Sequence, residues 1–272
     1  MTPGTLYVVS TPIGNLEDIT LRALRILREV SVIACEDTRQ TRKLLDHFDI
    51  QTAAISYHEH NEVSRAVELI KRIQDGENIA LVTDAGTPLV SDPGYRLVDA
   101  AVHAGVTIVP IPGASAVLSA LAAAGLPTDE FRFCGFLPQK QGQRRKVLES
   151  FAGERCTLVF YESPHRILEA LEDVNAVMGT RRMVLARELT KLHEEFIRGT
   201  AAEIGAALAQ RTAVKGEITL LIGKGEPVID DTPVLDAVAA LEAQGVSKMD
   251  AIKQVARTRG LSKRDVYREV NE

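Results

Sequence analysis

The sequence predicts an α/β fold that ends in a wholly helical segment. Short β-branched runs alternate with amphipathic helical patterns in the first half, strand and helix patterns continue after residue 113, and the end of the chain shows helical patterns only. The 272 residues, 45% hydrophobic and 25% charged, are enough for one large domain or two smaller ones with a sizeable core.

In the first half, strand patterns cover residues 5–10, 32–36, 78–82 and 106–110, and helical patterns cover 18–30, 38–48 and 61–76. Apolar residues recur at helical spacing in two of these helices, and Gly76 ends the later one. The predicted buried faces are Ile19, Ala23, Ile26, Leu27 and Val30 in the earlier helix, and Val63, Ala66, Val67, Ile70 and Ile73 in the later one.

The second half begins with a helix of small residues at 113–125, followed by strands at 131–136, 156–162, 183–188, 194–200 and 217–223. Helices are predicted at 165–178 and 201–210, and a polar basic loop follows the strand at 131–136. Prolines and glycines interrupt the pattern at 110–113 and again at 223–233. These breaks predict an N-terminal α/β domain at 1–112, a second α/β domain at 113–226 and a helical extension at 230–272.

Three short helices are predicted in the extension, at 232–245, 247–260 and 262–272, each capped by a Ser or Thr. The second ends in Gly260 and the third begins after one further residue, which is the shape of a helix-turn-helix. The net charge is −5, yet residues 244–272 carry +3. This pattern indicates an acidic body with a basic module, and it leaves open whether the module binds nucleic acid or only packs.

The sequence argues against several classes of protein. No apolar run is long enough for a membrane span, and the start lacks the order of a signal peptide, so a cytoplasmic protein is expected. Cys35, Cys134 and Cys156 are scattered in apolar settings, which favours buried thiols over a disulfide or zinc. The sequence lacks GxGxxG, GxxxxGK[ST] and HExxH, and residues 58–60 are expected to form a surface loop, so no metal is predicted.

Three loops rich in Gly, Pro, Ser and Thr follow predicted strands, at 10–15, 83–94 and 111–116. Ligands of open α/β sheets bind at the carboxyl ends of strands, so these loops are candidate ligand contacts. The Thr11 hydroxyl, the Asp84 carboxylate and the backbone at Gly86 are suited to a small polar ligand. A rigid turn at the first loop and tight helix packing at the third remain alternative explanations.

Five separated motifs, STPIGN, TDAGTPLVSDPG, IPGASA, FYESPHR and GEITLLIG, resemble in order the tetrapyrrole-methylase superfamily, and their spelling looks like its ribosomal RNA 2′-O-methyltransferase branch. The likeness extends to about Gly223, and the helical end also fits that branch. It implies two α/β domains with S-adenosylmethionine in the cleft between them. The porphyrin and corrinoid methylases have a glycine-rich first loop where this chain has STPIGN, a departure that disfavours a tetrapyrrole substrate.

The resemblance also implies a function and a set of cofactor contacts. The expected reaction is transfer of a methyl group to the ribose 2′-hydroxyl of a cytidine in the small-subunit (16S) ribosomal RNA, by a homodimer. A corrinoid or porphyrin C-methyltransferase and a non-enzymatic RNA-binding assembly factor are the alternatives. The residues expected to contact S-adenosylmethionine are Thr11, Pro12, Asp84, Ala85, Gly86, Thr87, Ser115, Ala116, Tyr161, Leu189 and Thr219.

A ribose hydroxyl is a poor nucleophile until its proton is removed or hydrogen-bonded, so charged residues at strand ends are candidate catalytic groups. Glu188 or Lys191 is expected to accept the proton or to position the acceptor, with Glu36 as a further candidate, although Glu188 can equally serve to pair with Arg187 or Lys191. Basic residues near the cleft and in the extension are the expected contacts to RNA phosphates. They are Arg39, Arg144, Arg145, Lys263 and Arg264.

Overall fold

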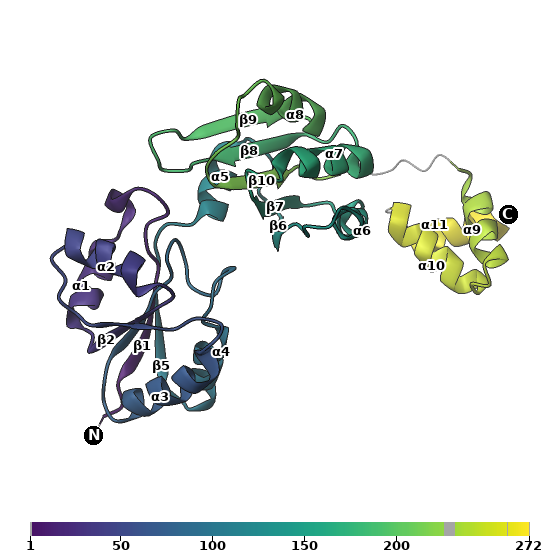
Figure 1. Ribbon diagram of the computed structural model, residues 1–272. Helices are drawn as coiled ribbons and strands as arrows, with labels where there is room; N and C mark the ends of the chain where they lie inside the picture. Colours follow the sequence, from purple (N-terminus) through teal and green to yellow (C-terminus); the bar gives the residue numbers. More distant parts are fainter. Residues whose placement is uncertain (1, 226–231, 260, 272) are drawn as a thin grey trace. The chain divides into compact units, whose positions relative to one another are not determined.

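A computed structural model describes residues 2–225, 232–259 and 261–271. The chain divides into two compact units. The larger unit extends to Lys224, apart from residues 153–155, and contains two β-sheets, whereas the smaller unit contains the C-terminal helices (Figure 1). The predicted α/β architecture with a helical end is confirmed.

The first lobe, residues 5–111, contains a five-stranded parallel sheet in the order β3-β2-β4-β1-β5. Its strands are β1 (Thr5–Val9), β2 (Val32–Cys35), β3 (Ala54–Ser56), β4 (Ile79–Leu81) and β5 (Thr107–Ile111). Four of them follow the predicted strand patterns, and β3 was not predicted. With only three residues at the sheet edge, β3 is too short to show an alternation of its own.

Helices cover both faces of this sheet (Figure 1). A 3₁₀ helix η1 (Leu16–Asp18), α1 (Leu21–Glu29) and α2 (Thr38–His47) follow β1 and β2, while α3 (Glu62–Gln74) and α4 (Tyr95–His103) pack together on the other face. The predicted face of α1 is confirmed, with Ala23, Ile26 and Leu27 buried. In α3 the predicted Ala66 and Ile73 are buried, but the predicted Val63 and Val67 are exposed. Leu69, which was not predicted, completes the buried face. Helix α4 was not predicted.

The second lobe, residues 116–222, contains a mixed sheet in the order β6-β7-β10-β8-β9. Only the β6–β7 pair is parallel. The strands are β6 (Phe131–Phe136), β7 (Thr157–Glu162), β8 (Met183–Arg187), β9 (Glu195–Gly199) and β10 (Ile218–Ile222). One core lies between this sheet and the helices α6 (Gln141–Phe151), α7 (Ile167–Met178) and α8 (Ala201–Ala209), and another contains α5 (Ala116–Ala124).

Helix α6 corrects an expectation, because its segment is predicted to be a polar basic loop. Arg144 is only 1% exposed, and its Nε donates to the Asp173 carboxylate of α7 at 2.7 Å. Arginine is usually exposed, so the sequence pattern around Arg144 predicted a surface loop. The carboxylate that allows Arg144 to be buried lies on another helix and is not visible in the local sequence. Cys134 and Cys156 are half-buried rather than buried, whereas Cys35 is fully enclosed.

The smaller unit contains α9 (Val234–Ala243), α10 (Lys248–Arg259) and α11 (Lys263–Asn271), which share their own apolar core. The Ser247 and Ser262 hydroxyls accept hydrogen bonds from the backbone N–H groups of Asp250 and Asp265, as the predicted caps require. The N-cap of α9 is Pro233 rather than Thr232, so the third predicted cap is wrong. Within the described ranges, no helix is long and apolar enough to cross a membrane.

Candidate active site

The three loops predicted as ligand contacts lie side by side, because they follow adjacent strands in the order β4, β1, β5. Thr11 and Gly86 exchange two backbone hydrogen bonds, of 2.9 and 3.1 Å. The Ser10 and Thr87 hydroxyls lie 2.9 Å apart, and the Ser10 N–H donates to the Ile111 carbonyl. The loop after β1 is therefore hydrogen-bonded to both neighbouring loops, which gives a rigid floor for a site.

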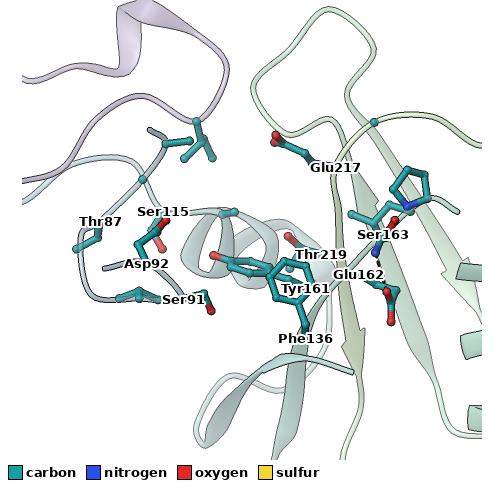
Figure 2. Close-up of a pocket in the computed structure, with 18 residues that line it drawn as sticks. Thr87, Ser91, Asp92, Ser115, Phe136, Tyr161, Glu162, Ser163, Glu217 and Thr219 are labelled. Carbon is teal, nitrogen blue, oxygen red and sulfur yellow. Dashed lines mark hydrogen bonds between the residues drawn. The ribbon is translucent and has the colours of Figure 1, made fainter. Parts of the chain in front are cut away.

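A cavity of about 400 Å³, called here the first cavity, opens above this floor. Figure 2 shows Thr87, Ser91, Asp92 and Ser115 on one side of it, Glu162 and Ser163 on the other, and Phe136 and Tyr161 between them. The lining thus comes from loops of the first lobe and from strand ends of the second. It consists of Ile13, Ala85, Gly86, Thr87, Val90, Ser91, Asp92, Ser115, Ala116, Phe136, Tyr161, Glu162, Ser163, Pro164, Gly216, Glu217, Ile218 and Thr219.

Every charged side chain that lines the first cavity is acidic. Glu162 pairs with Arg166 at 2.7 Å and Glu217 pairs with Lys191 at 3.1 Å, whereas Asp92 has no ion pair within the described part of the chain. Burial raises the pKa of Asp92 above its usual value. Burial, followed by the charges of Asp92 and Glu217, also raises the pKa of the Tyr161 hydroxyl, so this group stays neutral. A cationic ligand suits such a cavity.

Aromatic rings form the apolar part of the cavity wall. Tyr161 contacts Phe133 and Phe136 edge to face, with ring centroids 4.9 and 5.6 Å apart. Phe136 remains 58% exposed although it is part of this cluster, so one ring face is available to a ligand. Aromatic faces attract flat apolar groups and cations.

A second cavity of about 450 Å³ adjoins the first and shares Ile13, Ala85 and Glu217 with it. Its walls carry both charge signs, in contrast to the first cavity. They also include part of α2, which contributes nothing to the first. The remaining lining residues are Thr11, Pro12, Gly14, Leu16, Gln40, Lys43, Leu44, Asp84 and Lys191.

Lys191 projects from the loop after β8 into the second cavity. Its Nζ donates to Glu188 at 2.9 Å and to Glu217 at 3.1 Å. Burial alone would lower the pKa of Lys191, but these two carboxylates outweigh it and raise that pKa, while Lys191 and the Glu217 backbone N–H lower the pKa of Glu188. A Cβ added at Gly14 would lie 2.5 Å from the Lys191 side chain, so glycine is needed where the two lobes meet.

Backbone strain is concentrated around the two cavities. Five non-glycine residues of the described chain have left-handed φ angles, and only Asp49 among them lies elsewhere. Leu89 and Ser91 have φ of 74° and 64° in the loop after β4, and Glu188 and Thr190 have φ of 53° and 66° in the loop of Lys191. Such conformations cost about 1–3 kcal/mol each and persist mainly at functional sites.

Most of the predicted cofactor contacts line one of the two cavities. Pro12, Asp84 and Thr11 line the second cavity, but the Thr11 hydroxyl donates to the Thr83 carbonyl at 3.0 Å instead of facing a ligand. Leu189 is 7% exposed and packs in the core around α5, behind the site. The predicted residues that line the first cavity are Ala85, Gly86, Thr87, Ser115, Ala116, Tyr161 and Thr219.

Of the predicted catalytic residues, Lys191 and Glu188 lie together, whereas Glu36 lies outside the linings of both cavities. Burial, followed by the charges of Asp84 and Asp92, raises the pKa of Glu36. Arg39 is exposed on α2 and pairs with Asp37 at 2.7 Å.

The predicted RNA contacts in α6 differ in exposure. Arg144 is buried against Asp173 and has no surface to offer a phosphate, while Arg145 is 46% exposed and also reaches Asp173, at 2.6 Å. Lys263 and Arg264 are exposed on α11 of the smaller unit.

Sequence reasoning missed Asp92, Phe136 and Glu217, which line the first cavity. Asp92 stands within the TDAGTPLVSDPG motif and was passed over in favour of Asp84. Glu217 belongs to the GEITLLIG motif and immediately precedes β10, so its place in that motif is a usable signal. Phe136 ends β6 with no signal in its neighbourhood beyond being an aromatic residue at a strand end.

Known proteins with similar sequences match nearly the whole chain. Residues 5–205 match the family of tetrapyrrole (corrin/porphyrin) methylases. The protein named ribosomal RNA small subunit methyltransferase I of Halalkalibacterium halodurans is 49% identical over 97% of this chain and 93% of its own length. The protein of the same name in Escherichia coli O157:H7 is 46% identical over 97% of this chain and 94% of its own length.

Solved structures share the fold at low sequence identity. A diphthine synthase superposes with a TM-score of 0.61 at 15% identity, over 81% of this chain and 90% of its own. The uroporphyrin-III C-methyltransferase of Thermus thermophilus complexed with S-adenosylhomocysteine superposes with a TM-score of 0.56 at 19% identity, over 82% of this chain and 98% of its own. These likenesses concern the fold only.

Proposed function

Because the chain belongs to the tetrapyrrole (corrin/porphyrin) methylase family, we propose that it transfers a methyl group from S-adenosylmethionine to the ribose 2′-hydroxyl of a cytidine in small-subunit ribosomal RNA. Relatives named ribosomal RNA small subunit methyltransferase I, at 42–50% identity, support this substrate class. The spelling of the loop motifs supports the ribose oxygen as the acceptor atom.

The acidic lining of the first cavity is the observation that carries the proposal. S-adenosylmethionine bears a positive sulfonium, whereas phosphate-bearing cofactors need cations or helix N-termini around their charge. Asp92, Glu217 and the aromatic faces of Phe136 and Tyr161 suit a sulfonium with its attached apolar groups. The volume of about 400 Å³ lies in the usual range for small-molecule sites.

The residues assigned to the cofactor are those on the walls of the first cavity. Gly86 has φ of 87°, and its backbone lies at the cavity surface, where a side chain would intrude. Ser115 caps α5 by accepting from the Leu118 N–H at 3.4 Å, which fixes the start of that helix beside the ligand. Tyr161 and Thr219 form the wall from the second lobe, while Thr11 and Leu189 support the site from behind.

The bound cofactor supplies the methyl group, and the chain has to align an acceptor oxygen with it in a dry site. Lys191 lies in the second cavity next to Glu217, which borders both cavities. Because its pKa is raised, Lys191 remains an ammonium that donates hydrogen bonds, so we assign it to orienting the acceptor oxygen, and the proton of the methylated hydroxyl leaves to solvent rather than to Lys191. Glu188 holds Lys191 in place.

RNA binding is assigned to exposed basic residues in both units. Arg39 and Arg145 belong to the larger unit, and Lys263 and Arg264 to the smaller one. Their role is to neutralise phosphates and to place the acceptor without reading its sequence. With these roles, the two α/β domains at 1–112 and 113–226 would form the catalytic part of the chain, and the extension at 230–272 would bind RNA.

The test is methyl transfer from labelled S-adenosylmethionine to small ribosomal subunits purified from a strain that lacks this protein. We expect one labelled dinucleotide that resists alkali, because a methylated 2′-oxygen blocks strand cleavage at that position. Subunits that stay unlabelled, while calorimetry shows cofactor binding, would refute the RNA substrate and favour a corrinoid or porphyrin acceptor.

We further propose that the protein works in the cytoplasm as a homodimer, on the strength of the family resemblance. Sedimentation velocity at micromolar concentration is expected to show a particle of about twice the 29.6 kDa chain mass. A monomer under these conditions refutes the dimer and leaves the proposed reaction standing.

A further inference from the structure

The second cavity is where the acceptor nucleotide has to enter, if the proposed function holds, because it adjoins the cofactor cavity at Ile13, Ala85 and Glu217. A ribose held at this junction has the second cavity beside it as the space for its base. Single-stranded RNA is read by enzymes and binding proteins in this way, with the base splayed out of its stack. The walls of the second cavity therefore decide which base fits.

The side chains that η1 and α2 present to the second cavity have the composition of a base-binding site. Leu16 and Leu44 provide apolar surface, and Gln40 and Lys43 provide polar groups. Bases are bound by apolar contacts to their faces and by hydrogen bonds to their edges. None of these four residues lines the first cavity, so they are available to the acceptor alone.

Gln40 and Lys43 form a pre-oriented pair. The Lys43 Nζ donates to the Gln40 Oε1 at 2.9 Å, one turn apart on α2. The start of α2 is itself held to the floor of the site, because the Asp37 N–H donates to the Asp84 carboxylate at 3.2 Å. With its carbonyl oxygen engaged by Lys43, Gln40 has its amide NH₂ left to donate to a ligand.

We propose that Gln40 is a specificity-determining residue that reads the Watson–Crick edge of the acceptor base, and that Lys43 is the residue that positions it. Cytosine presents acceptors at N3 and O2 and a donor at N4, whereas uracil presents a donor at N3 and acceptors at O2 and O4. An amide donor directed at N3 therefore pairs with cytosine and meets a like donor in uracil. Gln40 and Lys43 together would therefore make the proposed methyl transfer prefer cytidine to uridine.

The experiment compares small subunits reconstituted with cytidine or uridine at the position that nuclease mapping identifies. The wild-type enzyme is expected to favour cytidine in kcat/KM by roughly five- to hundredfold, the range for one good base contact. Gln40→Ala is expected to reduce this ratio to near one, and Gln40→Glu is expected to do the same, because a carboxylate accepts from the uracil N3–H and equally from the cytosine N4 amino group. Cofactor affinity, measured by calorimetry, should stay at the wild-type value in both variants.

Variants of Lys43 test the positioning role. Lys43→Met is expected to lower the cytidine-to-uridine ratio by freeing the Gln40 amide to rotate, and Lys43→Arg, which keeps a donor, is expected to restore most of it. Arg42→Ala on the same helix is the matched control, since Arg42 lies outside the lining of the second cavity and faces Asp46 at 3.9 Å. It should leave the ratio unchanged.

The outcomes separate this inference from the proposed function. If the wild-type enzyme labels the cytidine subunits and Gln40→Ala keeps the full preference for cytidine, then Gln40 does not recognise the base. The proposed reaction is unaffected by that result. Equal loss of activity on both subunits in Gln40→Ala and Lys43→Met also overturns base recognition by Gln40, because that result describes a phosphate contact. A wild-type enzyme that labels neither subunit refutes the proposed function and this inference together.

Discussion

Lys191 shows how neighbouring charges set the role of one residue. It is partly buried between Glu188 and Glu217, and the two hydrogen bonds to these carboxylates raise its pKa above the usual value for lysine. A general base near neutral pH needs the opposite change. The same contacts lower the pKa of Glu188, so both partners stay charged through the neutral range.

Replacing Lys191 by methionine is expected to lower kcat on the order of 10²-fold, the effect of removing one oriented donor at a reacting oxygen. Lys191→Arg should recover part of the activity, limited by its bulk over Gly14. Cofactor affinity should be unchanged in both variants, as calorimetry can check. A wild-type kcat that rises between about pH 7 and 9, with the rise absent in Lys191→Met, would instead show a neutral lysine acting as base.

Two sets of ion pairs connect helices and strands of the second lobe behind the site. The first joins α6 to α7, where Arg144 is 1% exposed and the Asp173 side chain is 0% exposed. The second joins β8, β9 and the segment after α8, where Glu195 accepts from Arg187 at 3.1 Å and from Arg211 at 2.8 Å. Both involve elements that lie against the same sheet as Tyr161 and Thr219.

Asp173→Ala is expected to destabilise the protein by about 3–5 kcal/mol, because it leaves the Arg144 guanidinium buried without its main counter-charge. Arg145→Ala removes a half-exposed partner of the same carboxylate and should cost less than about 1 kcal/mol. Urea unfolding of the two variants provides the measurement. Equal losses would show that burial does not distinguish the two contacts.

Glu195 is expected to make the free energy of unfolding depend on pH in the acid range. The hydrogen bonds from Arg211 and Arg187 lower its pKa to about 2, from 4.5 in the unfolded chain. A lowered folded-state pKa stabilises the protein fully above about pH 4.5, and this contribution is lost as the pH falls toward 2. Glu195→Gln should therefore lose on the order of 2 kcal/mol at neutral pH and show a flatter dependence of unfolding free energy below pH 4.5.

The exposed Glu172 of α7, replaced in the same way, controls for the loss of one negative charge. Glu172→Gln should keep the acid dependence of the wild type. If Glu195→Gln also keeps it, the contacts with Arg211 and Arg187 do not stabilise the folded chain.

Charge is distributed unevenly over the whole molecule. The chain has a net charge of −5, while residues 244–272, which belong to the smaller unit, carry +3. The acidic first cavity belongs to the larger unit. Within the proposed function, cofactor and RNA would meet surfaces of opposite charge, and the acidic lining would keep phosphates out of the first cavity.

The double variant Lys263→Ala, Arg264→Ala is expected to weaken RNA binding and to reduce the slope of log K against log salt by about 0.7 for each lost phosphate contact. Cofactor affinity should not change, because both residues lie in the smaller unit. Lys253→Ala, which removes a partner of Asp250 in α10, is the matched control. An unchanged salt slope would support the alternative that the three helices form a packing module only.

The sequence by itself determined the α/β class, four strands of the first sheet, the five strands of the second and the loops at residues 10–15, 83–94 and 111–116. These features are local: a strand shows its alternation and a loop its Gly and Pro content within a few residues. The neighbouring positions of the three loops were decided by the strand order β4, β1, β5 of the folded sheet.

Only the tertiary structure decided which side chains meet across the site. Asp92 and Glu217 come from different lobes, so no spacing in the sequence relates them. The sequence predicts Arg144 to be a surface cation, but in the fold it is buried beside Asp173. The sequence also allows Lys191 to be a base, but the two carboxylates that contact it in the fold raise its pKa. Burial and charge pairing depend on residues distant in the chain, and they determine the protonation and exposure on which the chemistry rests.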